Sequence, residues 1–392
     1  MKKILCLLLF FFLTFKVSAL EIISNNAVLY DLDNNSIVFE KNKDERVSIA
    51  SLTKIMTTIT ALENIDDINK RVTIPASAFN LDSIYASTAG FRKRQVVTYK
   101  DLLYGTFLSS GAESSNALAI LISGKISLFV ELMNQKVQDL ELKNTHFSNV
   151  TGLEKKDHYG SVDDIAVLLK YAYRNEEFKN IFMNRSYKVS DGTLILESTM
   201  QKIAKNNKID ISYIIGGKTG FTNEAGYCLA SIAYDSKHNK NYLLVTAGAN
   251  TDKKYNHILD AKNIYEYIFN IPIYNTLVSD TDKVITLNTR NTKEDAVDIY
   301  INTIKREIND FDNSKVKIEY VGKKVLTSKD KMGNKIGKVL VYYDNDLVES
   351  VDVMMPYNLH FSVERTISNY VLYVLMFIFI IFFIRRSFYE NN

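Results

Sequence analysis

The chain has 392 residues, of which 46% are hydrophobic and 24% charged, and its formal net charge is +3 at pH 7. This length exceeds the size at which a single hydrophobic core usually divides, so we expect more than one domain. Lys2, Lys3 and Lys16 lie in a predicted leader, and without them the acidic and basic residues balance. A neutral protein without a basic patch is a poor candidate for binding nucleic acid, so we expect no such partner.

The first residues have the pattern of a signal peptide. Lys2 and Lys3 precede an apolar run from Ile4 to Phe15, and Val17-Ser18-Ala19 places small residues at a cleavage position. The run is shorter than the roughly 18–20 residues that a membrane-spanning helix needs. We therefore expect residues 1–19 to be a signal peptide cleaved after Ala19, and an uncleaved anchor is the alternative.

Residues 20–270 show strands at both ends of a helical middle. This order indicates an antiparallel sheet whose first hairpin pairs with the late strands, an α+β arrangement with a helical subdomain. The helix that begins near Ser51 has apolar residues at a spacing near 3.6. The other expected helices are 100–108, 113–122, 128–139, 162–173 and about 257–269, and the expected strands are 27–32, 37–40, 213–218, 227–234 and 241–247.

The pattern changes near Asn270-Ile271-Pro272. From residue 284 to about 353, short alternating runs are separated by Gly322, Gly333 and Asn345-Asp346. Such runs predict a small β-rich domain over residues 271–360. A spacer or docking role is the economical interpretation of this domain.

The C-terminal segment has the composition of a membrane anchor. Every residue from Tyr370 to Ile384 is apolar or aromatic, so residues 367–384 form a candidate transmembrane helix. The segment lacks a polar face, which argues against a helix that lies in the interface. Arg385 and Arg386 follow, and the positive-inside rule then places residues 385–392 in the cytoplasm. We expect a plasma-membrane protein whose catalytic domain lies on the extracytoplasmic face.

The stretch Ser51-Leu52-Thr53-Lys54 places a hydroxyl and an amine on one helical face, because residues i and i+3 are neighbours there. Serine is a weak nucleophile at neutral pH unless an adjacent base activates it. Lys54 is the candidate base, provided that burial lowers its pKa to ~7–8.

Two further motifs support this interpretation. Ser110 lies just before an apolar helix, and Lys218-Thr219-Gly220 lies on a predicted strand where glycine permits close approach of a substrate backbone. Each motif is common when it occurs alone. Together and in this order, they match the S-x-x-K, S-D-N and K-T-G pattern of penicillin-recognising serine enzymes.

The sequence resembles serine-type D-alanyl-D-alanine carboxypeptidases, the low-molecular-weight penicillin-binding proteins, from about Ala27 to Phe269. The resemblance implies the penicillin-recognising fold, with the β-rich domain and the anchor after it. It also implies removal of the terminal D-Ala from peptidoglycan stem pentapeptides through an acyl-enzyme, which limits cross-linking during cell-wall synthesis, and acylation by β-lactams. Further family-like segments are Asn144-Thr145-His146-Phe147, Thr151-Gly152-Leu153, His158-Tyr159 and the residues from Lys218 to Tyr227.

The resemblance also implies roles for individual residues. Ser51 is the nucleophile, Lys54 the base and Ser110 the relay that hands the proton to the leaving nitrogen. Lys218, Thr219 and Thr222 bind the substrate's terminal carboxylate. The backbone N–H groups of Ser51 and Phe221 form the oxyanion hole. No cofactor or metal is expected, because His146, His238, His257 and His360 show no metal-ligand spacing, and His158 in a turn is expected to be structural.

One position departs from the family pattern. The third residue of the Ser-x-Asn motif is Ala112, so the side chain that contacts the substrate amide is missing there. Ser114-Ser115-Asn116 fits the motif in another frame, but the distance to the helix around Phe129 favours Ser110. Asn116 lies one helical turn beyond Ala112 and is the candidate replacement.

Other functions remain open at this stage. A D,D-endopeptidase or a weak transpeptidase would differ only in the substrate that it accepts. A β-lactamase would share the three motifs but needs a carboxylate-positioned water for fast deacylation. Because of Ala112, a non-catalytic wall-binding scaffold is a further alternative.

Overall fold

The computed structural model describes residues 21–81, 83, 86–272, 274–308 and 311–390. The predicted signal peptide, residues 1–19, lies outside the described residues. The chain forms two compact units, which divide between Ile271 and Pro272. Each unit has its own hydrophobic core.

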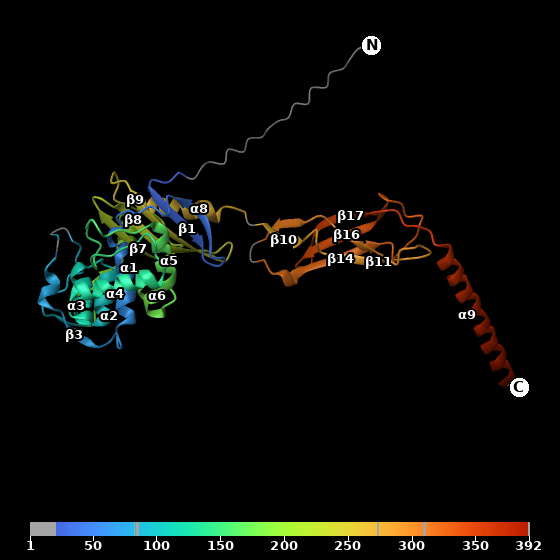
Figure 1. Ribbon diagram of the computed structural model, residues 1–392, viewed down its shortest axis with the longest axis horizontal. Helices are drawn as coiled ribbons and strands as arrows, with labels where there is room; N and C mark the ends of the chain where they lie inside the picture. Colours follow the sequence, from blue (N-terminus) through green and yellow to red (C-terminus); the bar gives the residue numbers. More distant parts are fainter. Residues whose placement is uncertain (1–20, 82, 84–85, 273, 309–310, 391–392) are drawn as a thin grey trace, which may run out of the picture. The chain divides into compact units, whose positions relative to one another are not determined.

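The N-terminal unit is built on a five-stranded antiparallel sheet in the order β2-β1-β9-β8-β7 (Figure 1). The hairpin of β1 (Asn26–Asp31) and β2 (Ser36–Lys41) pairs with β9 (Lys240–Ala249), which continues through β8 (Gly226–Asp235) to β7 (Ile214–Thr222). The first hairpin therefore pairs with the late strands, and the predicted α+β arrangement is confirmed.

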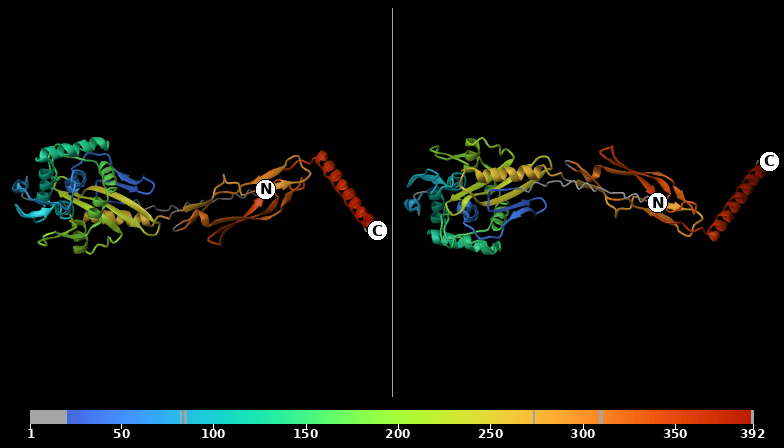
Figure 2. Two further views of the ribbon diagram at one scale, coloured as in Figure 1. Left: turned by 90° about the horizontal axis from the view of Figure 1, so that it is seen from below. Right: turned by 90° about the horizontal axis from the view of Figure 1, so that it is seen from above.

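The two faces of this sheet belong to two different cores, because successive side chains of a strand point to opposite faces. Leu29, Leu229 and Leu244 point to the side of α7 (Thr199–Asn206) and α8 (Asn256–Phe269). Their neighbours Val28, Ala230 and Val245 point to the opposite side, towards α1 (Thr53–Glu63) and α5 (Val162–Ala172). Figure 2 shows α8 and the larger helical layer on opposite faces of the sheet.

The helical layer contains most of the remaining elements of this unit. α2 (Tyr99–Phe107) begins with a capping box at Thr98 and Asp101, which satisfies the first free N–H groups of the helix. Around α2 lie α3 (Ala112–Ser123), α4 (Ile126–Asp139), α6 (Glu176–Met183) and the short hairpins β3–β4 (Arg71–Thr73 and Val96–Thr98) and β5–β6 (Ser186–Lys188 and Ile195–Glu197). The two hairpins, α6 and α7 are missing from the sequence prediction, because they are short or weakly apolar.

The C-terminal unit is a set of small sheets followed by one long helix. Its sheets pair β10 (Tyr274–Val278) with β13 (Ile304–Glu307), β11 (Ile285–Thr289) with β12 (Ala296–Ile299) and β15 (Val325–Leu326), and β16 (Lys335–Tyr343) with β14 (Val316–Gly322) and β17 (Asp346–Met354). α9 (Val363–Glu390) follows. Its window Val363–Ile381 has a mean hydropathy of 1.4 and no buried residue, so by length and composition it is a candidate membrane span.

Candidate active site

Ser51 and Lys54 lie at the start of α1, on the side of the helical layer that meets the sheet. Ser51 belongs to a 3₁₀ turn, η1 (Ala50–Leu52), which leads directly into α1, rather than to the α-helix itself. The tighter turn still brings the two side chains together, because residues i and i+3 lie above one another in a 3₁₀ helix. Lys54 Nζ lies 3.0 Å from Ser51 Oγ.

The environment of Lys54 favours its neutral form. The side chain is buried, and burial lowers the pKa of its amine to about 7, while the carboxylate of Glu113 acts in the opposite direction. The value lies in the range that a base needs at neutral pH. Lys54 Nζ also donates a hydrogen bond of 2.6 Å to the main-chain oxygen of Thr151, which fixes the position of the amine.

Ser110 and Lys218 form a second serine–lysine pair. Lys218 Nζ donates hydrogen bonds to Ser110 Oγ at 3.0 Å and to the main-chain oxygen of Thr219 at 2.8 Å. Ser110 has φ +57°, in the left-handed region, and ends the loop before α3. Burial lowers the pKa of Lys218 well below its ordinary value, and the charge of Lys54 adds to this effect. A charge on Lys54 therefore disfavours a second charge on Lys218.

The edge of the sheet forms the wall opposite η1. β7 pairs only with β8, so every second N–H and C=O group of its outer edge faces away from the sheet. A methyl group added at Gly220 would lie 3.0 Å from the backbone nitrogen of Ser51. Glycine thus lets β7 approach the nucleophile closely, and Phe221 and Thr222 line the adjoining space.

A small cavity at Ser51 shares part of its lining with a larger one. The first has a volume of about 40 Å³, and its lining residues are Ser51, Lys54, Ala86, Ser87, Ala112, Thr151, Gly152, Leu153, Phe221 and Thr222. The second, of about 540 Å³, shares Phe221, Thr222 and Leu153 with it and adds Ser83, Glu154, Lys155 and Asn223. The arrangement leaves room for a carboxylate or a methyl group beside Ser51 and for a longer peptide outside.

The loop that contains Asn149, Thr151 and Gly152 completes the site. The sequence prediction had given this loop no role. Asn149 Oδ1 accepts hydrogen bonds from the N–H groups of Thr151 and Gly152 at 3.0 and 2.7 Å, which fixes the carbonyl that holds Lys54. Gly152 has φ +81°, and an added methyl group there would lie 1.9 Å from the oxygen of Ala50. The resemblance of Thr151-Gly152-Leu153 to family segments was the available signal, but no property of the sequence linked this loop to Lys54.

Asn116 and Thr219 are not among the residues that line the small cavity at Ser51. Asn116 Nδ2 donates to the carbonyl of Ala78 at 3.2 Å, and Asn116 is not among the residues that line the cavity. The structure therefore does not bring its amide to the position left by Ala112, which does line the cavity beside Ser87. Thr219 Oγ1 lies 2.6 Å from Thr199 Oγ1, at the start of α7.

Glu113 organises the loop next to the cavity. Its Oε1 accepts hydrogen bonds from the N–H groups of Ala89, Gly90 and Phe91, at 2.7, 2.9 and 3.3 Å. The same carboxylate therefore both holds this loop in place and raises the pKa of Lys54.

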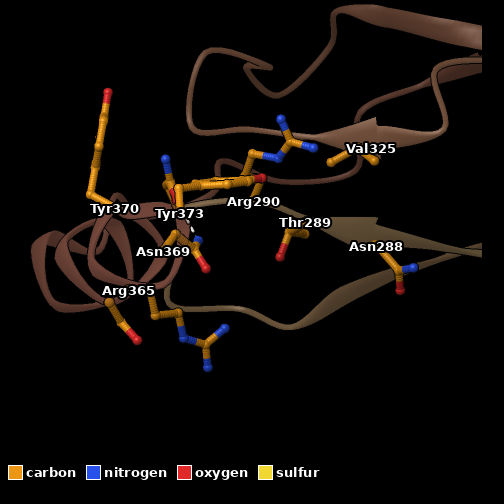
Figure 3. Close-up of a pocket in the computed structure, with 10 residues that line it drawn as sticks. Asn288, Thr289, Arg290, Val325, Arg365, Asn369, Tyr370 and Tyr373 are labelled. Atoms are coloured by element: carbon orange, nitrogen blue, oxygen red, sulfur yellow. Dashed lines mark hydrogen bonds between the residues drawn. The ribbon is translucent and has the colours of Figure 1, made fainter. Parts of the chain in front are cut away.

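A cavity in the C-terminal unit lacks comparable chemistry. It has a volume of about 620 Å³ and lies between β11 and the first turns of α9, where Arg290, Arg365, Asn369 and Tyr373 surround it (Figure 3). Asn369 donates to Asn291, and Arg365 pairs with Asp295. The residues lining this cavity include no nucleophile paired with a base, so hydrolysis is assigned to the N-terminal unit.

These features define a class of protein before any comparison. A serine faced by a buried lysine, beside the edge of an antiparallel sheet with a helical layer, is the arrangement of the penicillin-recognising serine enzymes. Comparison with solved structures agrees. Penicillin-binding protein 5 from Haemophilus influenzae is similar over 87% of this chain and 98% of its own, with a TM-score of 0.58 and 26% identity.

The family itself follows from the sequence match. The profile of Peptidase_S11, described as D-alanyl-D-alanine carboxypeptidase, matches residues 13–251, and the chain belongs to this family of serine hydrolases. D-alanyl-D-alanine carboxypeptidase DacF of Bacillus subtilis is 33% identical over 237 residues, 59% of each chain. D-alanyl-D-alanine endopeptidase of Escherichia coli is 27% identical over 259 residues, 63% of this chain and 78% of its own. The match thus spans about 60% of the length of the first two curated relatives.

Proposed function

We propose that this protein is a serine D-alanyl-D-alanine carboxypeptidase that removes the terminal D-Ala of peptidoglycan stem pentapeptides and so limits cross-linking. The observation that carries this proposal is the 3.0 Å distance between Ser51 Oγ and a buried lysine amine whose pKa is lowered to about 7. About half of an amine with this pKa is neutral at pH 7, and only the neutral amine can accept a proton.

The first step is acylation of the serine. Ser51 Oγ attacks the carbonyl of the penultimate D-Ala while its proton passes to Lys54 Nζ. The carbonyl oxygen becomes an oxyanion and is stabilised by the backbone N–H groups of Ser51 and Phe221. Removal of one such donor typically lowers the rate by ~10²–10³-fold. The C–N bond then breaks, and the nitrogen of the terminal D-Ala takes a proton as it leaves.

We assign Ser110 to protonation of the leaving nitrogen and Lys218 to the contacts that support it. The hydrogen bond from Lys218 Nζ to Ser110 Oγ leaves the serine's own proton available for donation. In this proposal Lys54 passes its proton through Ser110 to the departing nitrogen. The substrate's terminal carboxylate stabilises the ammonium form of Lys218, because an opposite charge nearby raises the pKa of a buried amine.

The carboxylate itself is bound at the end of β7. Thr222 lines the small cavity, and Thr219 lies on the same strand next to Lys218. We assign these two hydroxyls, with Lys218, to the carboxylate. The larger adjoining cavity, with Glu154 and Lys155 on its wall, then holds the rest of the stem peptide. Hydrolysis of the acyl-enzyme by water completes the cycle.

The chain ends support a place at the cell envelope. Residues 1–19 are assigned to a signal peptide, residues 20–270 to the catalytic domain and residues 271–360 to a β-rich spacer. The apolar window Val363–Ile381 of α9 supports the expected transmembrane anchor at residues 367–384, and Arg385 and Arg386 support a cytoplasmic tail at residues 385–392. The catalytic domain then faces the extracytoplasmic side.

Release of D-Ala from a pentapeptide that ends in D-Ala-D-Ala tests the proposal directly. The wild-type chain should release one D-Ala per peptide, and Ser51→Ala should lower the rate by at least ~10⁴-fold, as loss of a serine nucleophile does in other hydrolases. Ser51 should also be the residue labelled by fluorescent penicillin. Equal D-Ala release by the two proteins would reject the mechanism, and folded protein without labelling would favour a wall-binding scaffold.

An endopeptidase is the second candidate, because two similar proteins carry that name. The chemistry at Ser51 would be the same, and only the group after the cleaved bond would differ. A cross-linked muropeptide dimer and a pentapeptide offered together separate the two functions. Cleavage of the dimer at a rate equal to D-Ala release would favour the endopeptidase.

The stability of the penicilloyl adduct separates a carboxypeptidase from a β-lactamase. Fast deacylation requires a carboxylate that positions water. The described residues that line the small cavity at Ser51 include no carboxylate. We therefore expect an adduct that lasts for minutes or longer, and turnover of penicillin within seconds would contradict the assignment.

A further inference from the structure

A buried chain of three hydrogen bonds runs from His158 to the nucleophile's turn. The N–H of Ser148 donates to His158 Nδ1 at 3.1 Å, His158 Nε2 lies 2.7 Å from Thr53 Oγ1, and Thr53 Oγ1 donates to the oxygen of Ala50 at 2.8 Å. His158 is only 4% exposed and Thr53 is fully buried.

The direction of each hydrogen bond follows from the first one. Because His158 Nδ1 accepts the N–H of Ser148, the proton of the neutral ring is on Nε2. Nε2 therefore donates to Thr53 Oγ1, whose own proton is directed to Ala50. Burial keeps the ring neutral, because it lowers the pKa of His158 to about 4. All donors in the chain point towards the Ala50 carbonyl.

The carbonyl of Ala50 belongs to the same peptide group as the N–H of Ser51. A trans peptide is planar, with its C=O and N–H pointing in opposite directions. The oxygen faces Thr53 and Gly152, whereas the nitrogen of Ser51 faces β7 at Gly220. Thr53 therefore holds the carbonyl of this peptide by a hydrogen bond, and the N–H of the same peptide faces β7.

This peptide is held in an unfavourable backbone conformation. Ala50 has φ +44°, which costs an alanine free energy because its Cβ crowds the backbone. Strained residues keep such angles only where surrounding contacts impose them. The Ala50 oxygen accepts hydrogen bonds from both the hydroxyl and the backbone N–H of Thr53, and the backbone of Gly152 lies next to it.

We propose that His158 and Thr53 are positioning residues for the oxyanion hole: they fix the plane of the Ala50–Ser51 peptide and polarise the Ser51 N–H that receives the developing oxyanion. This inference rests on the function proposed above, in which that N–H binds the oxyanion. A hydrogen bond to a carbonyl strengthens the opposite N–H as a donor, because chains of hydrogen bonds polarise one another. His158 thus acts on the reaction through the backbone, not as a base.

The test uses substitutions that change one hydroxyl. Thr53→Val removes the donor to Ala50 and keeps the shape, Thr53→Ser restores the hydroxyl, and His158→Phe removes the support of Thr53. Thr60→Val is the matched control, because Thr60 is a buried hydroxyl on the same helix that contacts Met56 instead. Each protein is compared as the full chain, with its thermal unfolding recorded to separate loss of fold from loss of function.

Penicillin acylation supplies the catalytic readout. Thr53→Val should slow the acylation step by ~10–100-fold, less than the ~10²–10³ of a lost oxyanion donor, while the Kd of the initial complex stays within ~2-fold. The affinity for a boronic acid that forms a tetrahedral adduct with Ser51 should fall by a similar factor, because transition-state analogues report the same interaction. Thr53→Ser should recover most of the rate. Equal losses in Thr53→Val and Thr60→Val would overturn the inference.

A spectroscopic readout does not depend on activity. In protein labelled with ¹³C-carbonyl alanine and ¹⁵N-serine, the correlation from Ala50–Ser51 is the one that Ser51→Ala removes. Its carbonyl signal should move upfield in Thr53→Val and His158→Phe and stay in place in Thr60→Val. An unmoved signal overturns the inference even if activity falls. A wild-type chain that penicillin does not acylate would instead overturn the proposed function, whatever the carbonyl signal shows about the peptide.

Discussion

Lys54 Nζ and the main-chain oxygen of Thr151 are joined by a hydrogen bond of 2.6 Å, although the two residues are 97 positions apart in the chain. One N–H of the amine is thereby occupied, and Ser51 Oγ lies within 3.0 Å of the same nitrogen. A neutral lysine amine has one lone pair, so a fixed N–H leaves only two tetrahedral positions for the lone pair and the second hydrogen. The loop after α4 therefore contributes to the base as much as α1 does.

The acylation rate should depend on pH through Lys54. Its pKa in the folded protein is about 7, and the neutral amine is the active form, so the rate should fall about tenfold per pH unit below pH 7 and level off above it. The measurement is the second-order rate constant for penicillin acylation as a function of pH between pH 5 and 9. A rate that stays constant down to about pH 5 would contradict Lys54 and point to a carboxylate as the base instead.

Replacement of Glu113 should change the pH below which the acylation rate falls, which is the acid limb of the pH profile. The carboxylate raises the pKa of Lys54, so Glu113→Gln should shift the acid limb to lower pH while its remaining amide oxygen still accepts from Ala89 and Gly90. Glu131→Gln, at an exposed position of α4, is the control. A shift of the limb to higher pH in Glu113→Gln would contradict the electrostatic argument.

Ser110 and Lys218 should behave as one unit. Their side chains are in direct contact, and neighbours in one hydrogen-bond network show coupling of roughly 0.5–3 kcal/mol in double-mutant cycles. Ser110→Ala and Lys218→Gln should each lower the rate of D-Ala release, and the double variant should lose less than the two single losses together predict. The measurement is kcat/KM on the pentapeptide for all four proteins. Strict additivity would show that the two groups act separately.

Gly152 should tolerate no side chain. In Gly152→Ala the new methyl group would meet the Ala50 oxygen, so we expect a loss of several °C in Tm together with a large loss of penicillin acylation. Gly124→Ala is the matched control, because Gly124 has a similar φ of +75° but nothing within 4 Å of the added methyl group. Strain from φ alone should then lower Tm slightly and leave acylation unchanged. Equal effects at both glycines would remove the steric argument.

Removal of α9 should release the protein from membranes. The exposed side chains of Val363–Ile381 bury apolar surface only in a bilayer, so the full chain should fractionate with membranes and a chain ending at residue 360 should not. D-Ala release per mole should be similar for both, because the catalytic residues lie in the N-terminal unit. Membrane association of the truncated chain would assign attachment to another segment.

Several features were predictable because they depend on residues close together in the sequence. The pairing of Ser51 with Lys54 follows from a spacing of three residues. The sheet strands and the long helices follow from apolar periods of 2 and 3.6. The late strand with Lys218-Thr219-Gly220 is present, but only the structure shows that it is a sheet edge and that its glycine lies next to the backbone of Ser51.

Other features had no local signal. Asn116 and Ala112 lie one helical turn apart, yet the amide of Asn116 is held by Ala78 and does not reach the cavity. The burial that the Lys54 pKa requires is supplied by segments far from Lys54 in the chain, such as the loop that contains Thr151. His158 was expected to be structural, but only the fold shows that its hydrogen bonds lead through Thr53 to Ala50.

The sequence by itself determined which chemical groups are present, the order in which they occur and the elements that carry them. The tertiary structure decided how well those groups can work, since the burial of Lys54, the carbonyl of Thr151 that holds it and the plane of the Ala50–Ser51 peptide all come from segments far away in the chain. Desolvation and hydrogen-bond direction are properties of the whole packed unit. A local pattern of residue types cannot encode them, because each depends on where distant backbone atoms come to rest.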